Sequence, residues 1–357
     1  MRMILLAAFA ALAGAPALAQ EPISTREVVE AAITQYIRPE FHRFAELAAA
    51  MQGDVEALCA TPSQAGVDTA RSAFRDVVLS YSRIEFVQVG PLVMDNHLER
   101  LLFWPDRKGI ALKQVQQALA AKDETAAKPE TLLQKSVAMQ GLAALEYLLF
   151  GTGAETLATA DGAYRCSYAR SITTLMADLA AELDRDWSDP DGISAAMLNP
   201  QPDASDFRTD LEVLEKLAAT LIHGTEALRD QRLKPIEGTA EGAPKPRSAL
   251  FWRSDMTIPS VRANFAGLAD FFEKARFPEA ISAGEAETIA GIRAAYAKAQ
   301  EVAALITSPI EAAVNDPVQF KALDDLVVIT RDLDQLEGQN LARDLNLSVG
   351  FSALDSD

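Results

Sequence analysis

Histidine, cysteine and aromatic residues are scarce in this chain of 357 residues, which contains three histidines, two cysteines and 7% aromatic residues. So few imidazoles exclude a zinc site with several histidine ligands unless that site recruits nearly all of them. Basic residues are also too few for nucleic-acid binding, because the chain has 33 Lys and Arg against 51 Asp and Glu, which gives a net charge of −18. No segment rich in basic and aromatic residues compensates for this charge. A hydrophobic content of 49% excludes global disorder.

Long apolar runs are also lacking, since none reaches the roughly 20 residues of a membrane-spanning helix. The short apolar run 4–12 follows the basic Arg2, and Ala17-Leu18-Ala19 fits a cleavage site of the A-x-A type. We therefore predict a signal peptide over residues 1–19, a mature chain beginning at Gln20, no membrane span and a periplasmic or secreted protein. No cysteine stands at the cleavage site, so we expect no lipid anchor.

The two cysteines, Cys59 and Cys166, lie 107 positions apart. In an oxidising compartment an even pair of cysteines is more often bonded than free, so export predicts a disulfide. The alternative is two separately buried thiols. Thiol catalysis is less favoured, because no histidine is near either cysteine in the sequence.

Apolar residues recur with helical rather than alternating spacing along almost the whole chain. Ser24 and Glu27 form an S-x-x-E capping box that opens a helix, which Pro39 is expected to kink or break. Further helices are predicted over residues 64–87, 110–121, 131–151, from Cys166 onward, 206–232, 258–275, 283–307 and 316–344. These helices favour an all-α fold of two antiparallel bundles, residues 20–190 and 206–357, joined by a turn-rich linker over 191–205.

The segment from Gln140 to Gly151, QGLAALEYLLFG, resembles the hallmark of the imelysin family of M75 peptidase-like proteins, which is G-x-H-x-x-E followed by Y-L-L-F-G. Further fragments support the resemblance by their order: Val89-Gly90-Pro91, the stretch from Arg100 to Asp106, Arg253-Ser254-Asp255, the stretch from Val261 to Asn264, and residues 349–357. The resemblance covers essentially the whole mature chain. It implies an exported, all-helical, two-domain protein with a functional site between its domains and an association with iron uptake in bacteria.

The chain departs from this motif at Ala143, which stands at the position of the family's histidine. A histidine and a glutamate three residues apart on a helix approach one cation from the same side, whereas the methyl group of Ala143 offers no lone pair. Gly141, on the buried face of the predicted helix, is expected to allow close packing of another helix. The sequence therefore indicates a degenerate motif.

The histidines elsewhere give weaker signals. His223 and Glu226 have H-x-x-E spacing in the second half of the chain, where a solvated helix face is favoured over membership of a site. His42 and Glu46 are four residues apart, and a surface pair is favoured over a shared proton or metal.

Glu146 has two interpretations. It is either a flanking carboxylate that caps or pairs with an arginine, or the remaining acid of a degenerate site to which Glu85, Arg100 and His223 are the candidate contributors, with Gly141 as part of the motif. A carboxylate and a guanidinium in a sheltered cleft would hold a small polar ligand or a peptide end. Arg253 and Asp255 are candidates to face the same cleft, although packing or capping is the favoured role for them.

The leading hypothesis is an exported imelysin-like binding or accessory protein without peptidase chemistry. Its partner would be a small ligand, a peptide or a component of iron uptake, and a divalent metal or iron is the only cofactor considered. The alternative is a metal-dependent peptidase of the M75 type with non-standard ligands that include Glu146. A purely structural, partner-docking role for the helical scaffold is the third hypothesis.

Overall fold

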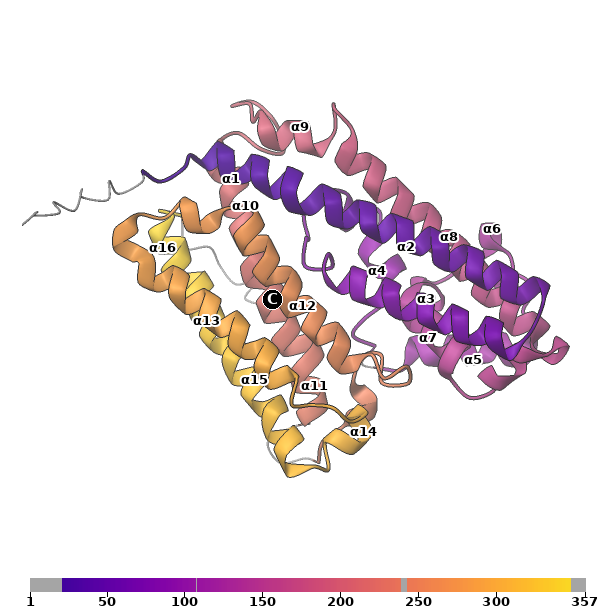
Figure 1. Ribbon diagram of the computed structural model, residues 1–357. Coiled ribbons are helices and arrows are strands. Elements are labelled where there is room, and N and C mark those ends of the chain that lie inside the picture. Colours follow the sequence, from indigo (N-terminus) through magenta and orange to yellow (C-terminus); the bar gives the residue numbers. More distant parts are fainter. Residues whose placement is uncertain (1–20, 107, 239–242, 348–357) are drawn as a thin grey trace, which may run out of the picture.

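The computed structural model describes residues 21–106, 108–238 and 243–347. Every regular element in these ranges is helical, which confirms the all-α prediction (Figure 1). The α-helices are α1 (Thr25–Ala31), α2 (Arg38–Ala60), α3 (Gln64–Ser82), α4 (His97–Leu101), α5 (Ile110–Ala121), α6 (Pro129–Leu132), α7 (Gly141–Phe150), α8 (Ala163–Ser188), α9 (Ile193–Leu198), α10 (Asp210–Ala227), α11 (Lys234–Glu237), α12 (Thr257–Lys274), α13 (Ala286–Ala303), α14 (Ile310–Ala313), α15 (Pro317–Gln335) and α16 (Ala342–Asp344). Over the described ranges, no helix has the length and apolarity of a membrane span. The predicted signal peptide and the fragment 349–357 lie outside the described residues.

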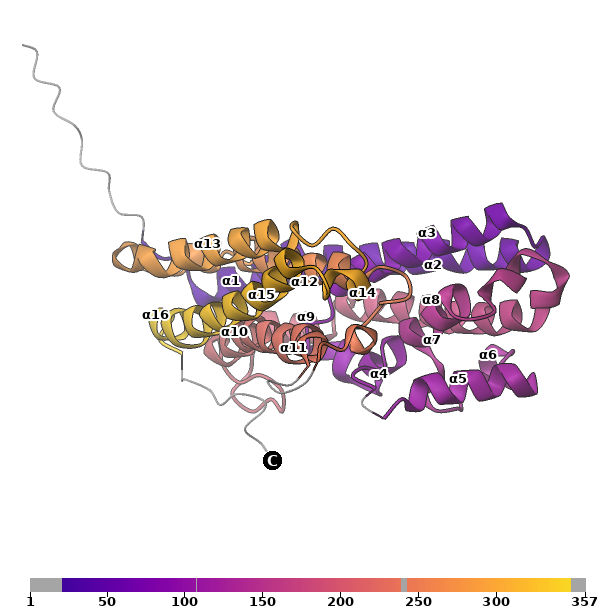
Figure 2. The ribbon, with the colours of Figure 1, turned by 90° about the horizontal axis from the view of Figure 1, so that it is seen from below.

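The helices form two bundles that lie next to each other along the long dimension of the molecule (Figures 1 and 2). In one bundle α2 packs between α3 and α8, and α7 packs against α8. In the other, α13 packs against α12 and α15, and α10 packs against both α12 and α15. Buried apolar side chains form one core cluster through both bundles. The division at residues 191–205 stays a prediction, and that segment contains the short helix α9.

The first helix contributes to both bundles. Ser24 and Glu27 form the predicted capping box. The break expected at Pro39 does not occur, because a π-helical turn, Ala32–Ile37, leads directly into α2. In this turn the amide of Arg38 bonds five residues back, so the wider helix accommodates a proline that has no N–H. As a result α1 packs against α10 of one bundle while α2 runs through the other.

The motif helix α7 begins at Gly141, ten residues later than the sequence predicted. The side-chain amide of Gln140 donates hydrogen bonds to the carbonyls of Leu132 (3.0 Å) and Lys135 (3.2 Å), which hold a turn before the helix. Gly141 has φ +70°, and a Cβ placed there would lie 2.4 Å from the carbonyl oxygen of Leu101. The expected close approach at this glycine is therefore confirmed, and the approaching backbone is the end of α4.

A disulfide joins Cys59, near the end of α2, to Cys166, near the start of α8, with 5.5 Å between the Cα atoms. The predicted pairing is confirmed. The bond closes a loop of 107 residues and ties together the two longest helices of the first bundle.

A partly buried polar cluster joins the two bundles next to the end of α3. Arg83 donates two hydrogen bonds, of 3.0 and 2.9 Å, to Glu40 on α2 and a third, of 2.6 Å, to Asp270 on α12. Asn264 of α12 donates to the carbonyl of Ser82 at 2.6 Å. The predicted helix over 64–87 therefore ends at Ser82, because the backbone turns there to meet the second bundle.

Candidate functional site

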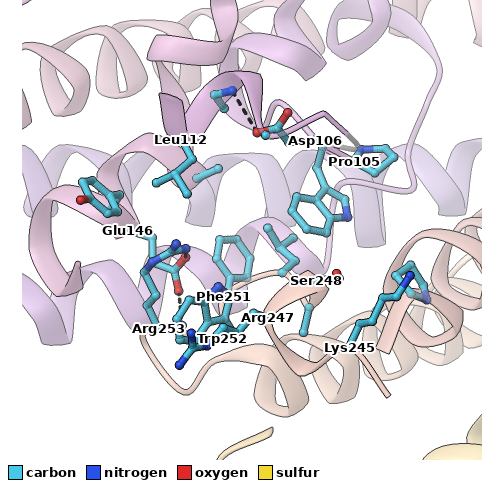
Figure 3. A pocket seen from close by; sticks show the side chains of 18 of the residues that line it. Pro105, Asp106, Leu112, Glu146, Lys245, Arg247, Ser248, Phe251, Trp252 and Arg253 are labelled. Carbon is cyan, nitrogen blue, oxygen red and sulfur yellow. Dashed lines mark hydrogen bonds and ion pairs between the residues drawn. The ribbon is translucent and has the colours of Figure 1, made fainter. Parts of the chain in front are cut away.

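The motif helix borders a pocket of about 650 Å³ between the two bundles (Figure 3). Its walls come from α7, from the segment around Trp104 to Leu112, from the region of α11, and from residues 245–253 ahead of α12. Pockets of this size bury most of the surface of a small organic ligand. This is where the resemblance placed a functional site.

Glu146 reaches this pocket from α7 but is only 3% exposed. Its Oε1 accepts hydrogen bonds from the amides of Arg253 (3.0 Å) and Ser254 (3.0 Å) and from the Ser254 hydroxyl (2.8 Å). Burial raises the pKa of the carboxyl, while the bonds from Ser254 and the charge of Arg253 oppose the rise. The carboxylate is thus held mainly by the amides of residues 253 and 254 and the Ser254 hydroxyl, with the Arg253 head group 4.0 Å away, and its membership of a functional site stays a prediction.

The segment held by Glu146 is a tight turn. Phe251 has φ +60° and Asp255 has φ +59°, a left-handed conformation that is costly for residues with a side chain. The amide of Met256 donates to the carbonyl of Phe251 at 3.0 Å and closes the turn. Glu146 therefore holds in place a strained turn that presents Trp252 and Arg253 to the pocket.

Aromatic and cationic groups alternate on this wall of the pocket. The guanidinium carbon of Arg253 lies 4.4 Å from the ring centre of Trp252 and 5.4 Å from that of Tyr147. Arg247 lies 5.3 Å from the centre of the same Trp252 ring (Figure 3). Burial lowers the pKa of Arg253, and the nearby Glu146 carboxylate, 4.0 Å from its Nη1, counteracts this. Such a wall suits a planar or apolar ligand that carries negative charge.

The acidic side chains that line the pocket already form hydrogen bonds or ion pairs within the protein. Asp106 accepts the amides of Ile110 (2.7 Å) and Ala111 (2.9 Å) at the start of α5. Asp230 forms ion pairs with Arg229 and Lys234. By contrast Lys245 lines the pocket without an ion pair to any described residue. The groups left for a ligand are therefore mainly cationic, although the whole chain has a charge of −18.

The donors around Glu146 do not fit a divalent cation. Ala143, half-buried at the pocket wall, supplies no ligand atom, and three hydrogen-bond donors and a guanidinium surround the Glu146 carboxylate. In the described part of the chain, no three His, Cys, Asp or Glu side chains are grouped as a metal site.

The other candidate residues do not meet Glu146. Glu85 pairs with Arg232 and accepts from Asn264 at 2.5 Å in a separate, smaller cavity between the bundles. Arg100 and Gly141 line a third cavity, inside the first bundle. Glu85, Arg100 and Gly141 therefore all lie outside the interbundle pocket.

The histidines are also placed elsewhere. His223 lines a cavity of about 770 Å³ in the second bundle, beside Glu226. It is half-buried rather than solvated as expected, because residues of α15 and the turn that follows cover this face of α10. His42 is exposed and contacts Asp184 at 2.9 Å and Glu46 at 3.5 Å, as expected of a surface pair.

Sequence reasoning did not place Tyr147, Arg247 and Trp252 at the pocket that they line. It named Arg253 as a candidate but favoured packing or capping, whereas Arg253 lines the pocket. The signal that was available is the run of Phe251, Trp252 and Arg253 directly after a loop rich in proline and glycine.

The fold is that of a helical two-bundle protein with a pocket of ligand size between its bundles. The sequence profile described as imelysin, peptidase M75, matches residues 37–339, and the chain belongs to the imelysin family. A search of curated proteins finds no match.

Solved structures share this fold. An imelysin-like protein from Psychrobacter arcticum superposes with a TM-score of 0.78 at 16% identity, covering 94% of this chain and 100% of that one. A candidate iron-regulated protein A precursor from Parabacteroides distasonis superposes with a TM-score of 0.74 at 14% identity, covering 92% of this chain and 97% of that one. At these identities the likeness establishes the fold alone.

Proposed function

We propose that this chain is an exported binding protein of the imelysin family that holds a carboxylate-bearing ligand in the interbundle pocket and does not act as a peptidase. The observation that carries the proposal is that Glu146 is already hydrogen-bonded to other residues of the protein. Its Oε1 accepts three hydrogen bonds from residues 253 and 254, so the motif carboxylate fixes the turn that forms the binding wall, and Nη1 of Arg253 lies 4.0 Å from its other oxygen, Oε2. The positive charge of Arg253 opposes proton uptake by this carboxylate and so disfavours its use as a general base.

The chemistry of the ligand follows from the groups that remain available. Arg253 and Lys245 suit a carboxylate, and the rings of Trp252 and Tyr147 suit a planar or apolar body. A small organic acid and the carboxyl end of a peptide share this chemistry.

Export and the link to iron have separate support. The predicted signal peptide and the Cys59–Cys166 disulfide both fit an oxidising compartment outside the cytoplasm. The name of the Parabacteroides neighbour mentions iron regulation, and we extend that context to this chain as part of the proposal.

Calorimetric titration and thermal shift of the purified mature protein test the proposal. The probes are citrate with and without Fe³⁺, aromatic carboxylates, and short peptides with a free or an amidated carboxyl end. We expect a carboxylate-bearing probe to bind and Arg253→Gln to weaken it about tenfold or more, as expected when a charge-assisted contact is lost. Arg208→Gln is the matched control, because Arg208 is exposed and lies outside this pocket.

A peptidase assay separates this function from the alternative. An unstructured peptide is incubated with wild-type protein and with Glu146→Gln, with and without a chelator. Chelator-sensitive cleavage that disappears in Glu146→Gln would overturn the proposal and favour a metal-dependent peptidase. Binding without cleavage supports it, and no binding of any carboxylate-bearing probe would count against it.

A further inference from the structure

The cavity lined by Arg100 and Gly141 has a volume of about 240 Å³ and lies within the first bundle, between α4, the turn that precedes α7, and α8. It is smaller than the roughly 300–1,000 Å³ of pockets for drug-sized ligands, so its volume suits a single small metabolite. It shares no lining residue with the interbundle pocket.

Charges of opposite sign line this cavity without meeting. The lining includes the partly buried Arg100 and the carboxylates of Asp95, Asp178 and Glu182, three residues that are exposed to solvent. Among the described residues, Arg100 makes no side-chain hydrogen bond and no ion pair within 4.0 Å, and its Nη1 is buried without a partner. The three carboxylates likewise have no ion pair in the described chain. A guanidinium and carboxylates that line one cavity without pairing are complementary to a ligand that carries both charges itself.

His97 adds a hydrogen-bond acceptor to the lining of the cavity. It is only 8% exposed, and its Nδ1 donates to the carbonyl oxygen of Pro91 at 2.9 Å. Because a carbonyl oxygen only accepts, this bond places the proton on Nδ1 and leaves Nε2 as the acceptor of the neutral ring. No described residue bonds to Nε2, although the ring lines the cavity.

The floor of the cavity is apolar. Ile172, Met176 and Leu179 on α8 are 1%, 3% and 8% exposed and follow one face of the helix. Leu133 also lines the cavity and is 39% exposed. This surface accommodates an aliphatic side chain of moderate length.

We propose that this cavity binds a free α-amino acid with an aliphatic side chain of the size of leucine or methionine. The α-carboxylate pairs with the guanidinium of Arg100. The α-ammonium donates to His97 Nε2 and to a carboxylate among Asp95, Asp178 and Glu182. The side chain lies on the floor formed by α8. This site is independent of the interbundle pocket and of the function proposed for it.

Isothermal titration of the mature protein with L-leucine and L-methionine tests the ligand class. L-Leucine methyl ester lacks the carboxylate and N-acetyl-L-leucine lacks the ammonium, so each is expected to bind at least about tenfold more weakly than leucine, which corresponds to about 1.4 kcal/mol. No binding of leucine or methionine, or equal binding of the two blocked forms, would overturn the proposal.

Variants test the position of the site. We expect Arg100→Gln, and at least one of Asp95→Asn, Asp178→Asn and Glu182→Gln, to weaken leucine at least about tenfold. Leu175→Trp fills the cavity without changing a charge and is expected to abolish binding, which provides a test if Arg100→Gln fails to fold. Arg43→Gln, at an exposed position on α2, is the matched control. Leucine binding that survives both Arg100→Gln and Leu175→Trp would place the ligand elsewhere.

Discussion

The hydroxyl of Ser254 donates a hydrogen bond of 2.8 Å to Oε1 of Glu146, although 108 residues separate them in the chain. This contact crosses from the first bundle to the turn that begins α12 of the second. It anchors residues 253 and 254 of the second bundle to the motif helix, so the stability of the contact between the bundles and the shape of the pocket depend on the same oxygen atom.

Replacement of Glu146 tests this dependence. Glu146→Ala leaves two backbone amides and a hydroxyl without their acceptor, so we expect the free energy of unfolding to fall by about 3 kcal/mol. Glu146→Gln keeps an acceptor oxygen and is expected to cost about 1 kcal/mol or less. Urea unfolding monitored by circular dichroism measures both, and equal losses in the two variants would contradict the role of the acceptor.

Gly141 is expected to tolerate no side chain. A Cβ at this position would lie 2.4 Å from the carbonyl oxygen of Leu101, and the residue has φ +70°. We expect Gly141→Ala to destabilise the protein by about 3 kcal/mol or more, since strain and a steric clash add.

Gly53 is the matched control for Gly141. It lies inside α2, and a Cβ there meets no atom within 4 Å. Gly53→Ala should therefore stabilise the protein by about 0.5–1 kcal/mol, because alanine is the better helix former. Thermal unfolding of both variants checks the opposite signs, and a harmless Gly141→Ala would show that the turn before α7 yields easily.

The disulfide should account for a large part of the stability. Loss of the Cys59–Cys166 bond releases a loop of 107 residues, for which the chain-entropy relation gives about 4–5 kcal/mol. We expect the double variant Cys59→Ser, Cys166→Ser to lose about this amount in guanidinium unfolding. A reducing agent should lower the midpoint of the wild type and leave that of the double variant unchanged, whereas a wild type unaffected by complete reduction would contradict the expectation.

The sequence predicted the fold more fully than the site, and the reasons are physical. Periodicity and capping act over a few residues, so the capping box at Ser24 and the helix Ile110–Ala121 could be predicted from local sequence. The close approach of the Leu101 carbonyl to Gly141 could not, since the two residues are 40 positions apart. Likewise the partners of Glu146 at residues 253 and 254 are fixed by packing between bundles, which no local pattern encodes.

A buried acid in the second bundle should govern the dependence of stability on pH. Glu337, in the π-helical turn that follows α15, is fully buried, and it accepts hydrogen bonds from Tyr296 (2.5 Å) and Thr225 (2.9 Å). Burial raises its pKa from 4.5 to about 8, and the nearby charge of Asp334 adds to the rise, whereas the two hydrogen bonds lower it. The folded protein therefore keeps a proton on Glu337 that the unfolded chain releases near pH 4.5.

The sign of the effect follows from this difference in proton binding. The contribution of Glu337 to stability is fully present below about pH 4.5 and is lost progressively as the pH rises toward about 8, because the folded state binds more protons than the unfolded state in this window. At about 1.4 kcal/mol per pKa unit, the loss amounts to a few kcal/mol.

Glu337→Gln cannot ionise, and its amide offers both an acceptor and donors to the two hydroxyls, so it should flatten the pH profile of the free energy of unfolding between pH 5 and 8. Denaturant titrations at several pH values measure the slope, with Glu30→Gln, at an exposed position on α1, as the control that should keep it. A slope that is the same in wild type and Glu337→Gln would mean that Glu337 is already ionised in the folded protein, with Tyr296 and Thr225 as sufficient partners for its charge.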